Sequence, residues 1–184
     1  MTVFFTSDTH FGDHRVIFMY RRPFASTGEM DEFLIARWNE KVGPADTVWH
    51  LGDFAVRASE RRVDDLLIRL NGRKHLITGN NDGPAVLKSA GWDSVTPYAE
   101  IEVEGTRLVL CHYAFRTWNG MHKKALNLHG HSHGRLAPMP RQFDVGVDAW
   151  DMRPVTLEEI VASRPARRSP KKKGAVQAPL PLDE

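Results

Sequence analysis

The chain has 184 residues, of which 41% are hydrophobic and 26% charged, as expected for one soluble domain. No apolar run approaches the roughly 20 residues that span a bilayer, and no basic segment precedes the first apolar residues as in a signal peptide. The single cysteine, Cys111, excludes an internal disulfide and suits a reducing compartment, so we expect a cytoplasmic protein without a membrane partner.

The formal net charge of +2 is unevenly distributed along the chain. Residues 164–184 hold six basic and two acidic side chains, a local charge of +4, which leaves −2 for residues 1–163. We therefore predict a domain over residues 1–163 and a basic, Pro-rich, disordered tail over residues 164–184. The tail leaves nucleic acid open as a partner, whereas the domain itself is not basic.

Strand and helix patterns alternate in the first half of the chain and give way to strands in the second half. The first half predicts strands at 3–6, 46–51 and 75–78, with helices at 29–42 and 59–70. The second half predicts a hairpin over 100–104 and 107–112, strands at 127–129, 135–137 and 143–147, and a helix at 156–163. This order indicates an α/β (α+β) fold in which stacked sheets are covered by helices.

Residues able to bind metal follow five of these strands. They are Asp8 and His10, Asp53, Asn80, His112, and His131 with His133. Because side chains alternate along an extended chain, Asp8 and His10 should face one ion, and His131 and His133 should likewise converge on one site. The mixture of imidazole, carboxylate and amide ligands exceeds one tetrahedral shell and favours manganese, iron, zinc or nickel.

These ligands predict two divalent ions, with Mn²⁺ as the first choice. Asp53 is the best candidate for the carboxylate that bridges them, since it is an isolated ligand on a central strand. Such a pair lowers the pKa of a bridging water and offsets charge on phosphoryl oxygens. The predicted reaction is therefore hydrolysis of a phosphate ester by a metal-activated hydroxide.

The ordered series Asp8-x-His10, Gly52-Asp53, Gly79-Asn80-x-Asp82, His112 and Gly130-His131-x-His133 resembles the calcineurin-like metallophosphoesterase family. The resemblance covers about residues 1–150 and implies a four-layer αββα sandwich of two mixed sheets flanked by helices. It also implies one ion held by Asp8, His10, Asp53 and His133, and a second held by Asp53, Asn80, His112 and His131. The Asp-Thr-His-Phe-Gly start is similar to that of small bacterial and phage-type phosphoesterases.

Asn81 departs from the pattern of that family, which usually has histidine there, near the leaving group. An amide donates a hydrogen bond but delivers no proton, and loss of a general acid typically removes roughly 10²–10⁴-fold in rate for a poor leaving group. Some small relatives without this histidine are similar to phosphodiesterases, so we predict a phosphodiesterase with Asn81, Asp53 and Asp82 as catalytic residues. Asp82 has an alternative role as the cap of the following helix.

Three residues are candidates for substrate binding, each with a competing interpretation. Arg22 could hold a phosphate with two parallel hydrogen bonds, or lie in a surface loop. Trp118 could stack on a base or cover the cleft, or belong to the core. His14, four residues beyond His10, could replace the missing proton donor.

Two competing functions remain open at this stage. One is a metal-binding scaffold for protein contacts without catalysis, for which Asn81 is the best argument. The other is a nucleic-acid-directed phosphatase or nuclease that uses the basic tail as an anchor. The sequence does not specify the natural substrate or the oligomeric state.

Overall fold

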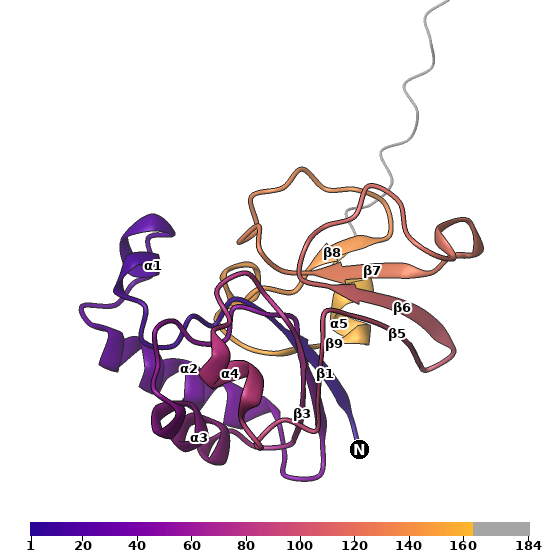
Figure 1. Cartoon of the computed structure of the whole chain (residues 1–184). Helices are drawn as coiled ribbons and strands as arrows, with labels where there is room; N and C mark the ends of the chain where they lie inside the picture. Colours follow the sequence, from indigo (N-terminus) through magenta and orange to yellow (C-terminus); the bar gives the residue numbers. More distant parts are fainter. Residues whose placement is uncertain (164–184) are drawn as a thin grey trace, which may run out of the picture.

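The computed structural model describes residues 1–163, so the predicted tail lies outside the described residues. Two mixed β-sheets pack face to face, with helices outside them, which confirms the predicted fold class (Figure 1). Among the described residues, no helix is both long enough and apolar enough to cross a membrane.

The first sheet has the strand order β4-β3-β2-β1-β9. Its strands are β1 (Val3–Thr6), β2 (Thr47–His50), β3 (Arg73–Ile77), β4 (Ser94–Thr96) and β9 (Val155–Thr156). The strands β1 to β4 are parallel to their neighbours, and β9 is antiparallel to β1. The parallel strands therefore place the loops that follow them at one edge of the sheet, as the ligand positions require.

The second sheet has the strand order β5-β6-β7-β8. Its strands are β5 (Tyr98–Val103), β6 (Thr106–Cys111), β7 (Leu126–His129) and β8 (Gln142–Asp144). β5 and β6 form the predicted hairpin, closed at Glu104 and Gly105, which both have positive φ. β6, β7 and β8 are parallel, so the loops after β6 and β7 also leave from one edge.

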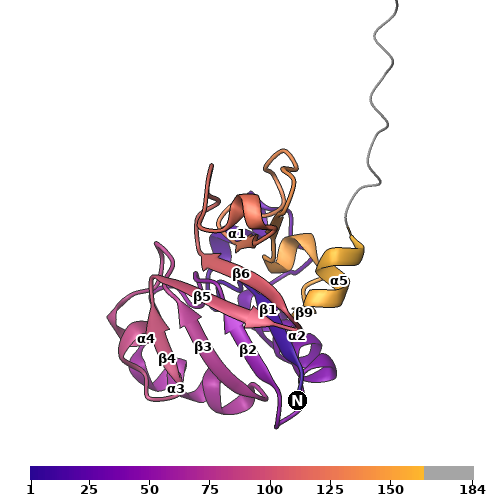
Figure 2. The same cartoon turned by 90° about the vertical axis from the view of Figure 1, so that its right-hand side faces the viewer.

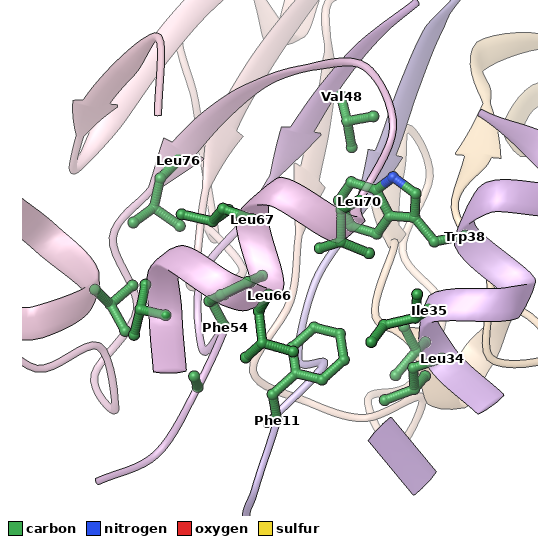
Figure 3. Close-up of a cluster of buried hydrophobic side chains, with 14 of the residues drawn as sticks. Phe11, Leu34, Ile35, Trp38, Val48, Phe54, Leu66, Leu67, Leu70 and Leu76 are labelled. Atoms are coloured by element: carbon green, nitrogen blue, oxygen red, sulfur yellow. The ribbon is translucent and has the colours of Figure 1, made fainter. Parts of the chain in front are cut away.

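Helices cover the face of the first sheet that points away from the second (Figure 1). They are α2 (Thr27–Lys41), α3 (Glu60–Arg69) and α4 (Pro84–Lys88). The Ser59 side chain accepts a hydrogen bond from the Arg62 amide and starts α3 as predicted. The apolar stripe of α3, with Leu66 and Leu67 at its centre, packs in the main core (Figure 3).

Alternation along the central strands divides the core into two parts. Phe4 of β1 points to the helices, whereas Phe5 points into the space between the sheets. On β6, Leu108 and Leu110 also face that space, and Val109 faces outward beneath Trp118. The outer face of the second sheet is covered by the short segment 113–125, which contains the 3-10 helix η1 (Met121–Lys123). The fourth layer of the fold is therefore thin.

Several short elements escape the sequence patterns. They are α1 (His14–Met19), β4, β9 and the 3-10 helix η2 (Val147–Ala149). β9 has two residues and exists through its pairing with β1, a contact that local sequence does not encode. The last helix is α5 (Leu157–Ala162), which begins at a capping box of Thr156 and Glu159 and lies beside β9 in both views (Figure 2).

Two strand predictions were wrong. Residues 135–137 form an exposed loop, because β8 pairs with β7 through Gln142 and leaves that segment outside the sheet. The strand predicted at 143–147 ends at Asp144, whose carboxylate accepts a hydrogen bond from the Gly146 amide and turns the chain.

The packing of α3 predicts a large stability effect at Leu66. The Leu66 side chain has no exposed surface, so its replacement by alanine leaves a cavity in the core. We expect the free energy of unfolding to fall by about 2–5 kcal/mol. Ile68→Ala on the same helix is the control, since Ile68 is 82% exposed and should change the value by no more than about 0.5 kcal/mol. Urea titration followed by circular dichroism measures both, and equal effects would contradict this description of the core.

Candidate metal centre

Polar loops from both sheets meet at the carboxyl ends of their parallel strands. β1, β2 and β3 supply residues from the first sheet, and β6 and β7 supply residues from the second. Two groups of possible ligand atoms form there, each with its atoms within 4.8 Å of one another. They are Asp8, His10 and His133 in the first group, and Asp53, His112 and His131 in the second.

The carboxylate of Asp53 lies between the two groups. Its Oδ2 atom is 3.5 Å from Nε2 of His10 and also 3.5 Å from Nε2 of His112. Asn80 belongs beside the second group, because its Oδ1 atom lies 3.0 Å from Nε2 of His112. All seven predicted ligands are thus brought together, with the Asp53 carboxylate equally far from one imidazole of each group.

Left-handed backbone, and not strand alternation, directs most of these side chains. Asp8, His10, Asp53, His131 and His133 all have φ between 48° and 64°. Non-glycine residues rarely adopt this conformation, and clusters of such strain are typical of functional sites. Asp8 and His10 do lie in one group, but their left-handed backbone brings them together, and not the alternation of side chains along a strand.

The same alternation argument was wrong for the other histidine pair. Nε2 of His133 lies 3.8 Å from Oδ1 of Asp8 in the first group, whereas His131 joins the second group. Their left-handed backbones turn the two imidazoles to different groups. The grouping of the histidines matches the one that the family resemblance implies.

Glycines allow the ligand loops to approach this closely. A Cβ atom on Gly146 would come within 2.7 Å of Oδ2 of Asp8, and one on Gly52 within 2.7 Å of Nδ1 of His112. Backbone hydrogen bonds from Asp8 to the Gly52 carbonyl and from His10 to the Asp53 carbonyl, both 3.0 Å long, join the first two loops. A side chain at either glycine would force these loops apart.

Hydrogen bonds to the outer nitrogens orient two of the imidazoles. Nδ1 of His112 donates to the Leu51 carbonyl at 2.8 Å, which leaves Nε2 directed at Asp53. Nδ1 of His133 lies 2.6 Å from the Asp148 carboxylate, which leaves Nε2 directed at Asp8. Such outer partners fix the ring orientation and tautomer of metal-binding histidines.

His10 supplies the direct test of whether these residues suit a metal ion. Both of its ring nitrogens are buried and lack a hydrogen-bond partner. Burial lowers the pKa of His10 to about 4, so the ring is neutral, the form that binds metals. Burial, with Asp144 and Asp53 nearby, raises the pKa of Asp8 well above its ordinary value. A cation bound at Nε2, the nitrogen that faces Asp8 and Asp53, would give that atom a partner and offset the crowded carboxylates.

Asn81 and Asp82 both act on Asp53, in different ways. Asn81 donates to both carboxylate oxygens, from its backbone amide at 2.8 Å and from its side chain at 2.7 Å. The carboxylate of Asp82 accepts hydrogen bonds from the backbone amides of Asp53, Phe54 and Gly79. Burial raises the pKa of Asp82 to about 6, although the hydrogen bonds from Gly79 and Phe54 oppose this shift.

Asp82 is therefore a positioning residue that joins the loops after β2 and β3. Both of its oxygens are occupied by backbone donors, so the structure does not support the prediction that it is a catalytic group. The alternative of a helix cap is also wrong, because the cap of α4 is Gly83, without a side-chain hydrogen bond.

The substrate-binding predictions for Arg22 and Trp118 are corrected by burial. Arg22 is 3% exposed, and its guanidinium donates to the Asp148 carboxylate and to the backbone carbonyls of Asp8 and Thr9. It therefore neither lies in a surface loop nor has donors free for a phosphate. Trp118 is 8% exposed, and its indole donates to the Ala125 carbonyl in a core cluster.

His14 is exposed at the start of α1, outside both ligand groups. Sequence reasoning had assigned it to substrate only by its spacing from His10. The structure brings it to no predicted ligand, so its proposed role as a proton donor gains no support from its position.

Sequence reasoning missed three residues that contact the ligand groups. Asp148 holds His133, Tyr20 stacks on the His133 ring with 3.5 Å between centroids, and the Tyr113 ring lies 4.8 Å from that of His131. Burial alone would raise the pKa of Asp148, yet hydrogen bonds from His133 and Arg22 lower it to about 2. Only the position of Tyr113, directly after His112, gave a signal in the sequence.

Comparison with known proteins finds relatives in a phage and in an archaeon. The gene 66 protein of Mycobacterium phage D29 is 32% identical in an alignment that covers 80% of this chain and 88% of the phage protein. An uncharacterised protein of Methanocaldococcus jannaschii, MJ1445, is 28% identical in an alignment that covers 86% of this chain and 89% of its own length.

A solved structure has the same fold. The protein of unknown function AQ665 from Aquifex aeolicus superposes with a TM-score of 0.70 at 24% identity, covering 88% of this chain and 98% of its own. The sequence pattern of the calcineurin-like phosphoesterase superfamily domain matches residues 1–142, a range that contains all seven predicted ligands. This chain therefore belongs to the calcineurin-like phosphoesterase superfamily and is a metal-dependent phosphoesterase.

Proposed function

We propose that the protein hydrolyses phosphodiesters and holds two divalent cations, Mn²⁺ first among them, that share the carboxylate of Asp53. The observation that carries the proposal is the equal 3.5 Å separation of Asp53 Oδ2 from His10 and from His112. The ligands would be Asp8, His10, Asp53 and His133 for one cation, and Asp53, Asn80, His112 and His131 for the other. Iron, zinc and nickel suit the same donors.

Bound divalent cations supply Lewis acidity, which lowers the pKa of water towards neutrality and offsets the charge on phosphoryl oxygens. The protein supplies orientation: Asn81 holds both oxygens of Asp53, and Leu51 and Asp148 hold His112 and His133. Since these groups are fixed before substrate arrives, little reorganisation is needed during the reaction.

Exposure indicates the side from which the substrate reaches the centre. Asp8, His10 and His112 are buried, whereas Asn80 and His131 are exposed. A phosphate ester would therefore approach past Asn80 and His131, at the second ligand group.

The amide at position 81 supports a diester as the substrate. The family usually has a histidine there, near the leaving group, and some small relatives without it are similar to phosphodiesterases. Here Asn81 delivers no proton, and its side chain and backbone amide both donate to Asp53.

Replacing Asp53 tests the shared ligand. We expect Asp53→Ala to abolish Mn²⁺-dependent hydrolysis of bis(p-nitrophenyl) phosphate and to lower bound Mn²⁺ from about two ions per chain to about one or none, because both sites lose a ligand. Plasma emission spectrometry of the dialysed protein counts the metal. Asp65→Ala on α3 is the control, since Asp65 is exposed and remote from the ligand loops. Full activity in Asp53→Ala would reject the bridging role.

Replacing Asp148 tests the orientation of His133. Asp148→Asn removes the carboxylate that accepts the hydrogen bond from Nδ1 of His133. We therefore expect the affinity for one of the two cations to fall roughly 10- to 100-fold, while the affinity of the other site changes little. Calorimetric titration with Mn²⁺ separates the two sites. Asp151→Asn, an exposed change in the same loop, should leave both affinities unaltered. An unchanged titration of Asp148→Asn would show that His133 needs no outer partner.

A further inference from the structure

Hydrolysis of an ester with a poor leaving group needs a proton donor beside the departing oxygen. Asn81 does not meet that need, since an amide delivers no proton at ordinary pH. Its side chain is moreover turned to Asp53, at 2.7 Å, and its backbone amide is bound to the same carboxylate at 2.8 Å. The donor must therefore come from elsewhere in the structure.

Tyr113 has the position and exposure that such a donor requires. It follows His112 in the loop after β6, and 47% of its surface is exposed. Its hydroxyl lies 3.4 Å from Oδ1 of Asn80, and its ring packs edge-on against His131, with 4.8 Å between centroids. The phenol thus stands at the open side of the second ligand group, where the substrate would enter.

The contact of this hydroxyl is a loose one. A distance of 3.4 Å exceeds the 2.5–3.0 Å that is usual for a hydroxyl donor and an oxygen acceptor. The hydroxyl is therefore free to turn from Asn80 to an arriving ester oxygen without losing a strong hydrogen bond.

Tyr20 is the competing phenol near the centre, and its surroundings differ. Its ring lies parallel to that of His133, and the guanidinium of Arg135 covers it at 4.5 Å from the centroid. It is stacked on the first ligand group, away from the exposed Asn80 and His131. The third tyrosine, Tyr98, donates to Glu100 and serves as a neutral comparison.

We propose, on the basis of the phosphodiesterase function above, that Tyr113 is the catalytic residue that protonates the leaving oxygen. As the bond from phosphorus to that oxygen breaks, the oxygen keeps the electron pair. The O–H bond of Tyr113 breaks, and its proton moves to the oxygen to give the free alcohol. The phenolate then recovers a proton from water. A phenol is a stronger acid than an aliphatic alcohol, so the transfer is favourable.

The test compares leaving groups in the Mn²⁺-loaded protein and in Tyr113→Phe. Methyl p-nitrophenyl phosphate releases a stable anion that needs no proton, and we expect its kcat to change by no more than about threefold. Methyl phenyl phosphate releases a phenol, and its kcat should fall by an intermediate factor. A dinucleoside monophosphate releases an aliphatic alcohol, a much poorer leaving group, and its kcat should fall roughly 10²-fold or more. The slope of log kcat against leaving-group pKa should steepen accordingly.

Tyr98→Phe is the matched control, because it removes one hydroxyl outside the ligand groups and keeps the ring, and it should retain the slope of the unmodified protein. Tyr20→Phe tests the competing phenol and should not steepen the slope if Tyr113 is the donor. All three variants should bind the same number of Mn²⁺ ions. The number of bound ions reports on the centre independently of turnover. A change in that number for Tyr113→Phe would assign the hydroxyl to ligand positioning and overturn the proposal.

The remaining outcomes separate the two proposals. If the unmodified protein hydrolyses the esters and Tyr113→Phe loses the same factor on all of them, or nothing, Tyr113 is not the proton donor and the phosphodiesterase function stands. A steeper slope in Tyr20→Phe alone would assign the proton to Tyr20. If the unmodified, metal-loaded protein hydrolyses none of the esters, both proposals fail.

Discussion

The position of the Asp53 carboxylate is the constraint around which the rest of the centre is organised. One of its oxygens lies 3.5 Å from an imidazole nitrogen of each ligand group, and Asn81 binds both oxygens. Its backbone amide is held by Asp82. A buried carboxylate is costly without compensating partners, and here the hydrogen bonds from Asn81 supply part of that compensation. The two proposed cations would supply the rest.

Holding that arrangement requires strained backbone in several loops. The five ligands with left-handed backbone would each be destabilising in isolation. The surrounding structure compensates for this strain, because the loops start from parallel strands with fixed register and are joined by backbone hydrogen bonds. The packed sheets therefore serve the site directly: they fix the points from which the ligand loops depart.

A buried ion pair between Arg22 and Asp148 links the ligand loop after β1 to η2. Arg22 donates to the carbonyls of Asp8 and Thr9 and to Asp148, which in turn holds His133. One guanidinium thus controls the shape of the first ligand loop and the orientation of a histidine more than a hundred residues away. Because Arg22 and Asp148 are paired and hydrogen-bonded, the low dielectric of their surroundings strengthens this link.

By itself, the sequence determined which residue types end the strands and in what order they occur. That was sufficient for stacked sheets covered by helices, the β5–β6 hairpin, the start of α3 at Ser59 and the set of seven candidate ligands, because periodicity, caps and ligand spacing are local signals. The arrangement as two mixed sheets came from the family resemblance. Spacing along the strand put His131 and His133 on one site, whereas the family resemblance implied the division between two groups that the tertiary structure has. Left-handed backbone depends on the contacts of the whole loop, so spacing along a strand could not reveal it.

The roles of Arg22, Trp118 and Asp148 were also decided by tertiary structure. From the sequence alone, an arginine or tryptophan between predicted elements is as compatible with substrate binding as with a structural role. Both side chains can contact a substrate or pack inside the protein. Arg22 became structural because Asp148, 126 positions later in the chain, lies within hydrogen-bond distance of it. Contacts between residues so far apart in the sequence form only when the two sheets pack, which is why no local pattern contained them.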